Sequence, residues 1–201
     1  MRITVPRVAM FVAVAVLAQV TATSQGSARR LAIRCGRLID GKADTAAGPS
    51  VILIEGDHIT AVGPNPNIPT DAQVIDLSRA TVLPGLIDAH THMFNQRRPN
   101  GTTEDYMLIA VQNVEATLRA GFTAARDMTS HGNGYGDVAI RKAINEGRID
   151  GPRYQVSTLG IVWGANPPNP AAPANPLAST VIRSAEEGRA AVREQIAHGA
   201  D

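Results

Sequence analysis

The fold class of this chain is decided by residues 81–92, which are TVLPGLIDAHTH. Because side chains alternate between the two faces of a β-strand, a strand here places Asp88, His90 and His92 on the same face. Two imidazoles that project in one direction from a rigid strand lose little side-chain entropy when they bind one ion. Neutral imidazole is a preferred ligand of zinc and neighbouring transition metals, so this stretch predicts a metal site.

The residues around the two histidines make this prediction more specific. Taken alone, a His-x-His pair also occurs at ordinary polar strand ends. Residues 84–92, PGLIDAHTH, however, resemble the signature P-G-[LF]-I-D-x-H-x-H of the amidohydrolase superfamily. The resemblance implies that His90 and His92 coordinate a catalytic metal ion.

Three further segments resemble the same superfamily and occur in the same order. Residues 51–63, VILIEGDHITAVG, are similar to the hairpin that precedes the barrel, and residues 121–127, GFTAARD, to the second barrel strand. Residues 143–153, AINEGRIDGPR, are similar to a segment of the branch that contains imidazolonepropionase-like enzymes and metal-dependent Xaa-Pro dipeptidases. On these segments the chain is identified as a member of that branch, and we expect it to contain the N-terminal portion only.

The composition is that of a folded protein without a nucleic-acid partner. The chain has 201 residues, of which 44% are hydrophobic and 18% charged, enough for the core of one large or two small domains. The formal net charge is +1 and the cationic residues are scattered, so no phosphate-tracking surface is expected. The expected partner is a small-molecule or short peptide-like substrate, and a homo-oligomer is left open.

The first residues have the pattern of a secretory signal peptide. Arg2 and Arg7 precede the apolar residues 8–18, and small residues follow, with a plausible cleavage end at residues 20–22. Residues 1–22 are therefore predicted to be a signal peptide, and the protein to be exported, either periplasmic or secreted. The apolar stretch is shorter than the roughly 20 residues of a membrane span, so no stable membrane insertion is expected after removal of the signal. An uncleaved anchor is the alternative.

The next segments are predicted to be a linker at residues 23–30 and a small β-sandwich-like domain at residues 31–80. Its short apolar runs are broken by Gly, Pro and Asp, with Gly56 and Asp57 as a tight hairpin connection. The expected strands are residues 31–33, 51–55, 58–62 and 74–77. Cys35 is the only cysteine, so no internal disulfide is possible, and it is expected to be a small core residue rather than a nucleophile.

From residue 81 onwards the pattern changes to strands that alternate with helices. Three strand-then-helix units in a row favour an α/β fold with parallel strands and right-handed crossovers. The expected strands are residues 82–90, 122–128 and 154–159, and the expected helices are residues 104–119, 137–146 and a third that a capping box opens at Ser184 and Gly199 ends.

The resemblance implies that residues 81–201 are the N-terminal part of a TIM-type (β/α)8 barrel. A complete barrel of this kind takes about 250 residues, so an incomplete barrel with about three β/α units is expected. In the family, the third helix runs into G-A-D-x-[IV]-K, whose carboxylated lysine bridges two metals. This chain ends with residues 199–201, GAD, just before that lysine.

The resemblance also implies the reaction. A metal ion lowers the pKa of its bound water to about 7 and polarises a carbonyl group, so hydroxide can hydrolyse an amide, cyclic amide or peptide-like C–N bond. One or two Zn²⁺ ions are expected, and Mn, Co or Fe are compatible with the ligands. The remaining ligands, a lysine, two histidines and an aspartate, are expected beyond Asp201, so the 201-residue chain alone is predicted to be inactive. The alternative is a catalytically inactive remnant that acts as a metal-binding or interaction module.

Three other residues are candidates for supporting roles. Asp88 either orients a histidine ring or fixes the start of the strand. Asp127, at the end of the second strand beside Arg126, either supports the site, through substrate or a ligand, or forms a structural ion pair. His131, in a glycine-rich loop on the active-site side, is a candidate substrate contact or a solvated loop residue.

The segment after the third predicted strand departs from the family pattern. Many dipeptidase-like members carry a T-G-G-H-G run there, whereas this chain has LGIVWGAN at residues 159–166. The missing histidine weakens the prediction of Xaa-Pro dipeptidase activity. Trp163 and the proline-rich residues 166–176 are predicted to form a lid or an apolar wall for substrate, or else an exposed loop without a catalytic role.

Overall fold

The computed structural model describes residues 28–94, 101–164 and 177–201. The predicted signal peptide, most of the predicted linker and the proline-rich residues 166–176 lie outside the described residues. The chain divides into two compact units, Met1–Val82 and Leu83–Asp201. No helix in the described part of the chain is long and apolar enough to cross a membrane.

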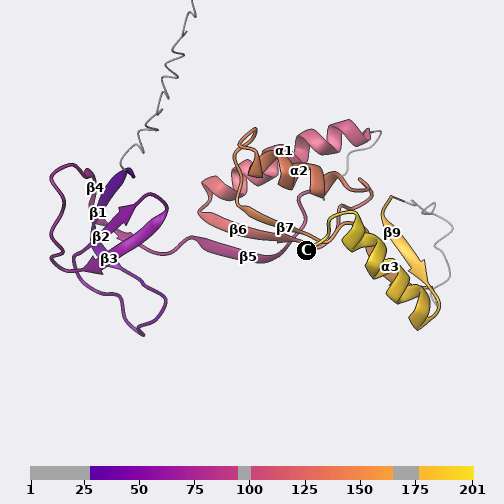
Figure 1. Ribbon diagram of the computed structural model, residues 1–201, viewed down its shortest axis with the longest axis horizontal. Helices are drawn as coiled ribbons and strands as arrows, with labels where there is room; N and C mark the ends of the chain where they lie inside the picture. Colours follow the sequence, from indigo (N-terminus) through magenta and orange to yellow (C-terminus); the bar gives the residue numbers. More distant parts are fainter. Residues whose placement is uncertain (1–27, 95–100, 165–176) are drawn as a thin grey trace, which may run out of the picture. The chain divides into compact units, whose positions relative to one another are not determined.

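The described residues of the first unit form one four-stranded sheet in the order β3-β2-β1-β4 (Figure 1). Its strands are β1 (Arg30–Leu38), β2 (Ser50–Glu55), β3 (His58–Gly63) and β4 (Gln73–Val82). It is thus a single sheet rather than the two packed sheets of the expected sandwich. β1 pairs antiparallel with β2 and parallel with β4, and a tight turn at Gly56, with φ of +63°, joins β2 to β3 as predicted.

The core of this sheet lies around Cys35, Leu38 and Ile52. The Cys35 thiol is buried and donates a hydrogen bond to the carbonyl of Ser50 over 3.3 Å, which fits the predicted role as a small core residue. β4 is longer than the predicted residues 74–77, because β1 pairs with it as far as Val82. Val82 therefore ends β4 and does not begin the next strand.

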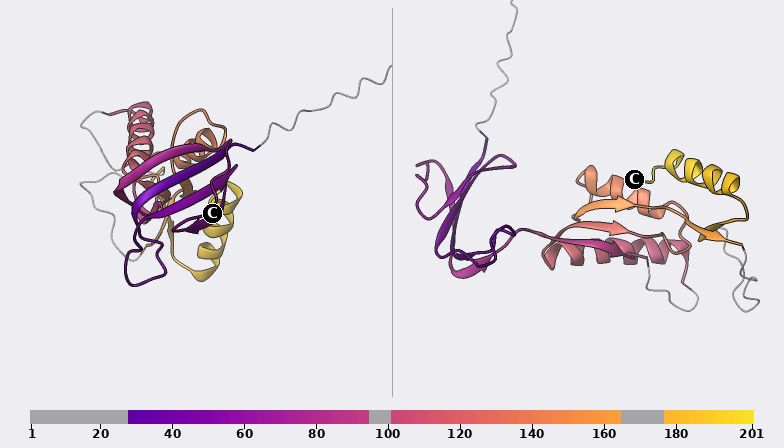
Figure 2. Two further views of the ribbon diagram at one scale, coloured as in Figure 1. Left: turned by 90° about the vertical axis from the view of Figure 1, so that its left-hand side faces the viewer. Right: turned by 90° about the horizontal axis from the view of Figure 1, so that it is seen from below.

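The second unit contains a parallel sheet in the order β5-β6-β7, with β5 (Leu86–Thr91), β6 (Phe122–Asp127) and β7 (Arg153–Val156). Figure 2 (right) shows these three strands side by side in one layer. Helices α1 (Thr103–Arg119) and α2 (Gly136–Asn145) pack on one side of this layer (Figure 1). The predicted α/β class and parallel strands are confirmed.

The core of the second unit lies between this sheet and the two helices. The buried residues that share it are Met93, Phe94, Ala110, Val114, Ala125, Ile140, Tyr154 and Val156. The helix predicted at residues 104–119 thus contributes its buried residues Ala110 and Val114 to this core.

After β7 the structure differs from the prediction. The third strand ends at Val156 instead of residue 159, because Thr158 adopts a left-handed φ of +64° and its N–H donates to Asp137 Oδ2 over 2.7 Å. A parallel two-stranded ladder of β8 (Gly160–Trp163) and β9 (Ser179–Ile182) follows and was not predicted. Helix α3 (Ala185–Ala197) comes next.

The helix starts are close to those predicted. Ser184 caps α3 by accepting a hydrogen bond from Glu187 N, but the Glu187 carboxylate accepts from Arg183 N, so the reciprocal bond of the predicted capping box is absent. The reciprocal pair is found instead at α1, where Thr102 and Asp105 accept each other's backbone N–H.

Candidate metal centre

Parallel strands end at the same edge of a sheet, and the candidate residues gather at that edge. His90 belongs to β5, and His92 directly follows the strand's last residue. Thr91 of β5 is the register partner of Asp127, the last residue of β6. The carboxyl edge of the sheet therefore brings the histidine pair and this buried carboxylate together.

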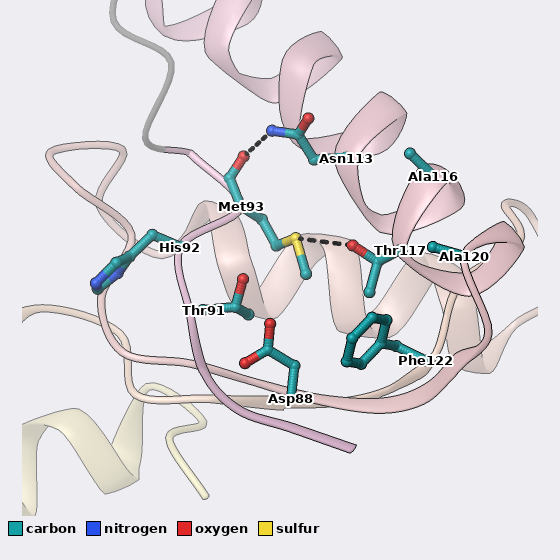
Figure 3. Close-up of a pocket in the computed structure, with 9 residues that line it drawn as sticks. All are labelled: Asp88, Thr91, His92, Met93, Asn113, Ala116, Thr117, Ala120 and Phe122. Carbon is teal, nitrogen blue, oxygen red and sulfur yellow. Dashed lines mark hydrogen bonds between the residues drawn. The ribbon is translucent and has the colours of Figure 1, made fainter. Parts of the chain in front are cut away.

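The pairing of β5 with β6 is irregular at this point. The register shifts between Leu86 and Ile87 and again between Asp88 and Thr91. Asp88 and Thr91 consequently line the same cavity of about 490 Å³ against α1 (Figure 3). Strict alternation would have placed them on opposite faces, so it does not hold along this strand.

Figure 3 shows how the side chains of this cavity lie. The His92 ring points away from the carboxylate of Asp88, which lies beside Thr91. Asp88 accepts a hydrogen bond from the backbone N of His90 over 3.2 Å, and among the described residues neither histidine ring donates a hydrogen bond to Asp88. The contact that the structure gives Asp88 is thus one that shapes the strand end.

Three imidazole rings lie next to one another at the sheet edge. The centroids of His90 and His92 are 5.1 Å apart with an interplanar angle of 84°. The His131 ring also contacts the His92 ring. Their centroids are 4.3 Å apart and the interplanar angle is 81°. His131 adopts a left-handed φ of +50° in the loop between β6 and α2. The loop histidine singled out in the sequence therefore belongs to the same cluster as the pair.

Asp127 supports this cluster from within the sheet. Its side chain is 0% exposed and accepts hydrogen bonds from Met93 N over 3.2 Å, from Thr129 N over 3.3 Å and from the hydroxyl of Tyr154. Burial raises the pKa of Asp127 above its ordinary value, and the hydrogen bonds from Tyr154, Met93 and Thr129 oppose this rise. The exposed Arg126 forms no ion pair with Asp127, so the structural ion pair considered for these two neighbours is absent.

His92 turns one of its ring nitrogens toward this carboxylate. His92 Nδ1 lies 3.9 Å from Asp127 Oδ1. It is buried and has no hydrogen-bond partner among the residues that the structure describes. Histidines that bind metals through one nitrogen usually donate the other N–H to a carboxylate or a carbonyl. The arrangement thus suits a ring whose Nε2 holds a ligand.

The cluster supplies part of a metal site. Among described residues, no group of three His, Cys, Asp or Glu side chains is close enough to hold a metal ion. His90 and His92 are nevertheless two imidazole donors on one strand end, and a buried carboxylate backs one of them. Their chemistry fits two ligands of a divalent metal, with further donors required from elsewhere.

Trp163 and Tyr154 are not part of the histidine cluster. Trp163 is the last residue of β8, where it pairs with Ile182 of β9, and it is 57% exposed. Tyr154 was not singled out in the sequence, although its hydroxyl contacts Asp127. Only the register of β6 and β7, which pairs Ala125 with Tyr154, places that ring on the face of Asp127.

Comparisons with known proteins found similar sequences. A model of the amidohydrolase family matches residues 81–201. The chain is 33% identical over 99 residues to a dihydroorotase of Syntrophobacter fumaroxidans. The aligned region covers 47% of this chain and 21% of that protein. It is 33% identical over 87 residues to an imidazolonepropionase of Deinococcus radiodurans. That aligned region covers 39% of this chain and 21% of that protein.

Solved structures extend the similarity to both units. A Xaa-Pro dipeptidase with bound methionine in the active site superposes with a TM-score of 0.74 at 29% identity. The superposition covers 86% of this chain and 45% of that one. The chain therefore spans less than half the length of each of these proteins.

Proposed function

Because the chain belongs to the amidohydrolase family, we propose that it is part of a metal-dependent hydrolase in which His90 and His92 bind a divalent metal ion. The observation that carries this proposal is the contact of His92 Nδ1 with the buried carboxylate of Asp127 over 3.9 Å. A carboxylate at Nδ1 favours the tautomer in which Nδ1 carries the proton and Nε2 is free to act as a ligand.

The proposed site residues at the sheet edge have different roles. His90 and His92 hold the ion, and Asp127 keeps the His92 ring in its orientation and tautomer. His131, whose ring lies against His92, faces the same edge and contacts substrate. When bound, the metal supplies hydroxide at neutral pH and polarises the carbonyl of the substrate. Zinc is the proposed ion, and Mn, Co and Fe suit the same ligands.

We place the second unit as the first three β/α units of a (β/α)8 barrel. Support comes from the parallel order β5-β6-β7 and from the end of the chain, where Asp201 N donates to the carbonyl of Val156 over 3.0 Å. That contact sets the backbone beside the end of β7. The proposed lysine, two histidines and aspartate of the complete site come from further barrel strands, as the resemblance implies.

The proposed substrate contains an amide, cyclic amide or peptide-like C–N bond. The similar proteins are a dihydroorotase, an imidazolonepropionase and a Xaa-Pro dipeptidase, and they support this bond class without selecting one member of it. Each of these C–N bonds can be hydrolysed by attack of hydroxide on the carbonyl carbon. A small molecule or short peptide is therefore the proposed substrate.

The test is a measurement of metal content. The protein with its natural C-terminus is expected to contain one or two divalent ions per chain, and the double variant His90→Ala, His92→Ala to lose them and all turnover. The matched control is His58→Ala, because His58 is an exposed histidine of β3 in the other unit. Unchanged metal stoichiometry in the double variant would remove the assignment.

A further inference from the structure

We propose that Tyr154 is a positioning residue for His92, because its hydroxyl holds the Asp127 carboxylate in the orientation that presents Oδ1 to His92 Nδ1. The inference rests on the proposed function and adds to it a residue from another strand. Tyr154 touches neither imidazole through a hydrogen bond and acts through Asp127. Its effect is therefore on how firmly the site holds its ion.

The two oxygens of Asp127 have different partners. Oδ2 accepts hydrogen bonds from the Tyr154 hydroxyl and from Met93 N over 3.2 Å. Oδ1 accepts from Thr129 N over 3.3 Å and faces His92 Nδ1 over 3.9 Å. Donors to Oδ2 thus fix the carboxylate plane, and that plane decides where Oδ1 points.

Tyr154 is the side-chain donor in this set. The bonds from Met93 and Thr129 come from backbone N–H groups, whose positions follow from the strand ends. Tyr154 is 4% exposed and its ring belongs to the core between the sheet and α2. Phenylalanine can fill the same space, so one substitution removes the hydroxyl and keeps the packing.

The gap between Asp127 and His92 explains why the orientation matters. A direct N–H···O hydrogen bond is about 2.9 Å long, so the distance of 3.9 Å has to shorten by about 1 Å. A small ring rotation that accompanies ion binding closes it only if Oδ1 stays in place. A carboxylate released from Tyr154 can turn its oxygens away, and Nδ1 then loses its acceptor.

The first experiment compares metal affinities by competition with a chelator, using Zn²⁺ and the protein with its natural C-terminus. Tyr154→Phe is expected to bind Zn²⁺ about tenfold more weakly, the lower end of the effect of removing groups that orient metal ligands. The control is Tyr135→Phe, since the Tyr135 ring stacks on His198 instead. Unchanged affinity in Tyr154→Phe would overturn the proposal.

A double-mutant cycle separates positioning from packing. If Tyr154 acts through Asp127, then Tyr154→Phe weakens Zn²⁺ binding in the wild-type background and has little effect in Asp127→Asn. Equal effects in both backgrounds would show that the ring contributes by another route and would overturn the inference. Unfolding of the metal-free variants, measured alongside, reports the packing cost separately.

A third measurement needs no variant. In the Zn²⁺-loaded wild type, proton NMR should show a slowly exchanging Nδ1 proton on His92, because Asp127 accepts it. Its absence would contradict the arrangement even if Tyr154→Phe failed to fold. The proposed function fails separately, when the His90→Ala, His92→Ala variant keeps its metal. Loss of metal in that variant with normal affinity in Tyr154→Phe refutes only the role of Tyr154.

Discussion

Two buried carboxylates fix the loops that carry the histidines. Asp127 accepts a hydrogen bond from Met93 N, next to His92. Asp137, also 0% exposed, accepts from Thr158 N over 2.7 Å, and the carbonyl of Thr158 accepts from Ser130 N over 3.1 Å. Ser130 directly precedes His131. Each carboxylate therefore determines the backbone position of one ring in the cluster.

Asp137 gives the stability of this unit a pH dependence. Burial raises the pKa of Asp137 to about 6, against hydrogen bonds from Thr158 and Val138 that lower it. A carboxyl group whose pKa is raised on folding favours the folded state most below its unfolded pKa of about 3.9, and this stabilisation disappears as the pH rises through 6. At 1.36 kcal/mol per pKa unit the change is about 2–3 kcal/mol.

The measurement is the free energy of unfolding of wild type and Asp137→Asn between pH 4 and pH 7.5. The asparagine still offers an oxygen to Thr158 N, but it does not titrate. Relative to wild type, the variant should gain stability as the pH rises through 6. A stability difference that stays constant over this range contradicts the assigned pKa.

His131 is expected to act on substrate rather than on the metal. No group of three potential ligand side chains occurs in the described part of the chain, although the His131 ring lies 4.3 Å from that of His92. Asparagine tolerates the left-handed backbone at this position. His131→Asn should therefore keep its metal and raise KM about tenfold, the scale of one hydrogen bond. Loss of the metal would instead make His131 a ligand.

Among the elements, those with local signals were predicted well. α1 and α2 lie close to the helices predicted at residues 104–119 and 137–146, and the parallel strands follow from the alternation of strands and helices. β8 and β9 were missed because each is four residues long and gains its ladder only from the other. The extension of β4 likewise depends on its partner β1. Pairing between distant segments leaves no local pattern.

In the site, too, local motifs were predicted and contacts between distant segments were not. The motif pointed to His90 and His92, and the structure places their rings together. Asp88 lines one cavity with His92 and also with Thr91, because the register shift between Asp88 and Thr91 breaks the strict alternation that the prediction assumed. The bond between Tyr154 and Asp127 joins residues 27 positions apart and follows only from the register of β6 with β7.

A capping box closes the start of α1. Thr102 Oγ1 accepts from Asp105 N over 3.2 Å, and the Asp105 carboxylate accepts from Thr102 N over 2.9 Å. Thr102→Ala removes this cap and should lower the free energy of unfolding by about 1 kcal/mol. Denaturant titration measures the loss, with Thr103→Ala in the first helical turn as control. Equal midpoints for wild type and Thr102→Ala would show that the cap contributes nothing.

Apolar side chains of the second unit lie at its surface. Ile87 of β5 is 73% exposed and Ile196 of α3 is 60% exposed. In the proposed barrel, further strands and helices cover these positions. Exposed apolar surface of this kind promotes association when such cover is missing. The 201-residue chain by itself is therefore expected to associate as its concentration rises.

Residues 1–201 alone are expected to be inactive, because they supply only part of the proposed metal site. Catalytic zinc sites take about three protein ligands and an open position, whereas among the described residues no three potential ligand side chains are placed to hold one ion. If further ligands come from later barrel strands, residues 1–201 alone should bind Zn²⁺ far more weakly than the full-length protein and should hydrolyse no amide or peptide substrate. Chelator competition and turnover assays on both proteins, side by side, measure this. Robust turnover by the isolated chain that a chelator abolishes would mean that its own residues complete the site, and the proposed ligands from later barrel strands would then be unnecessary.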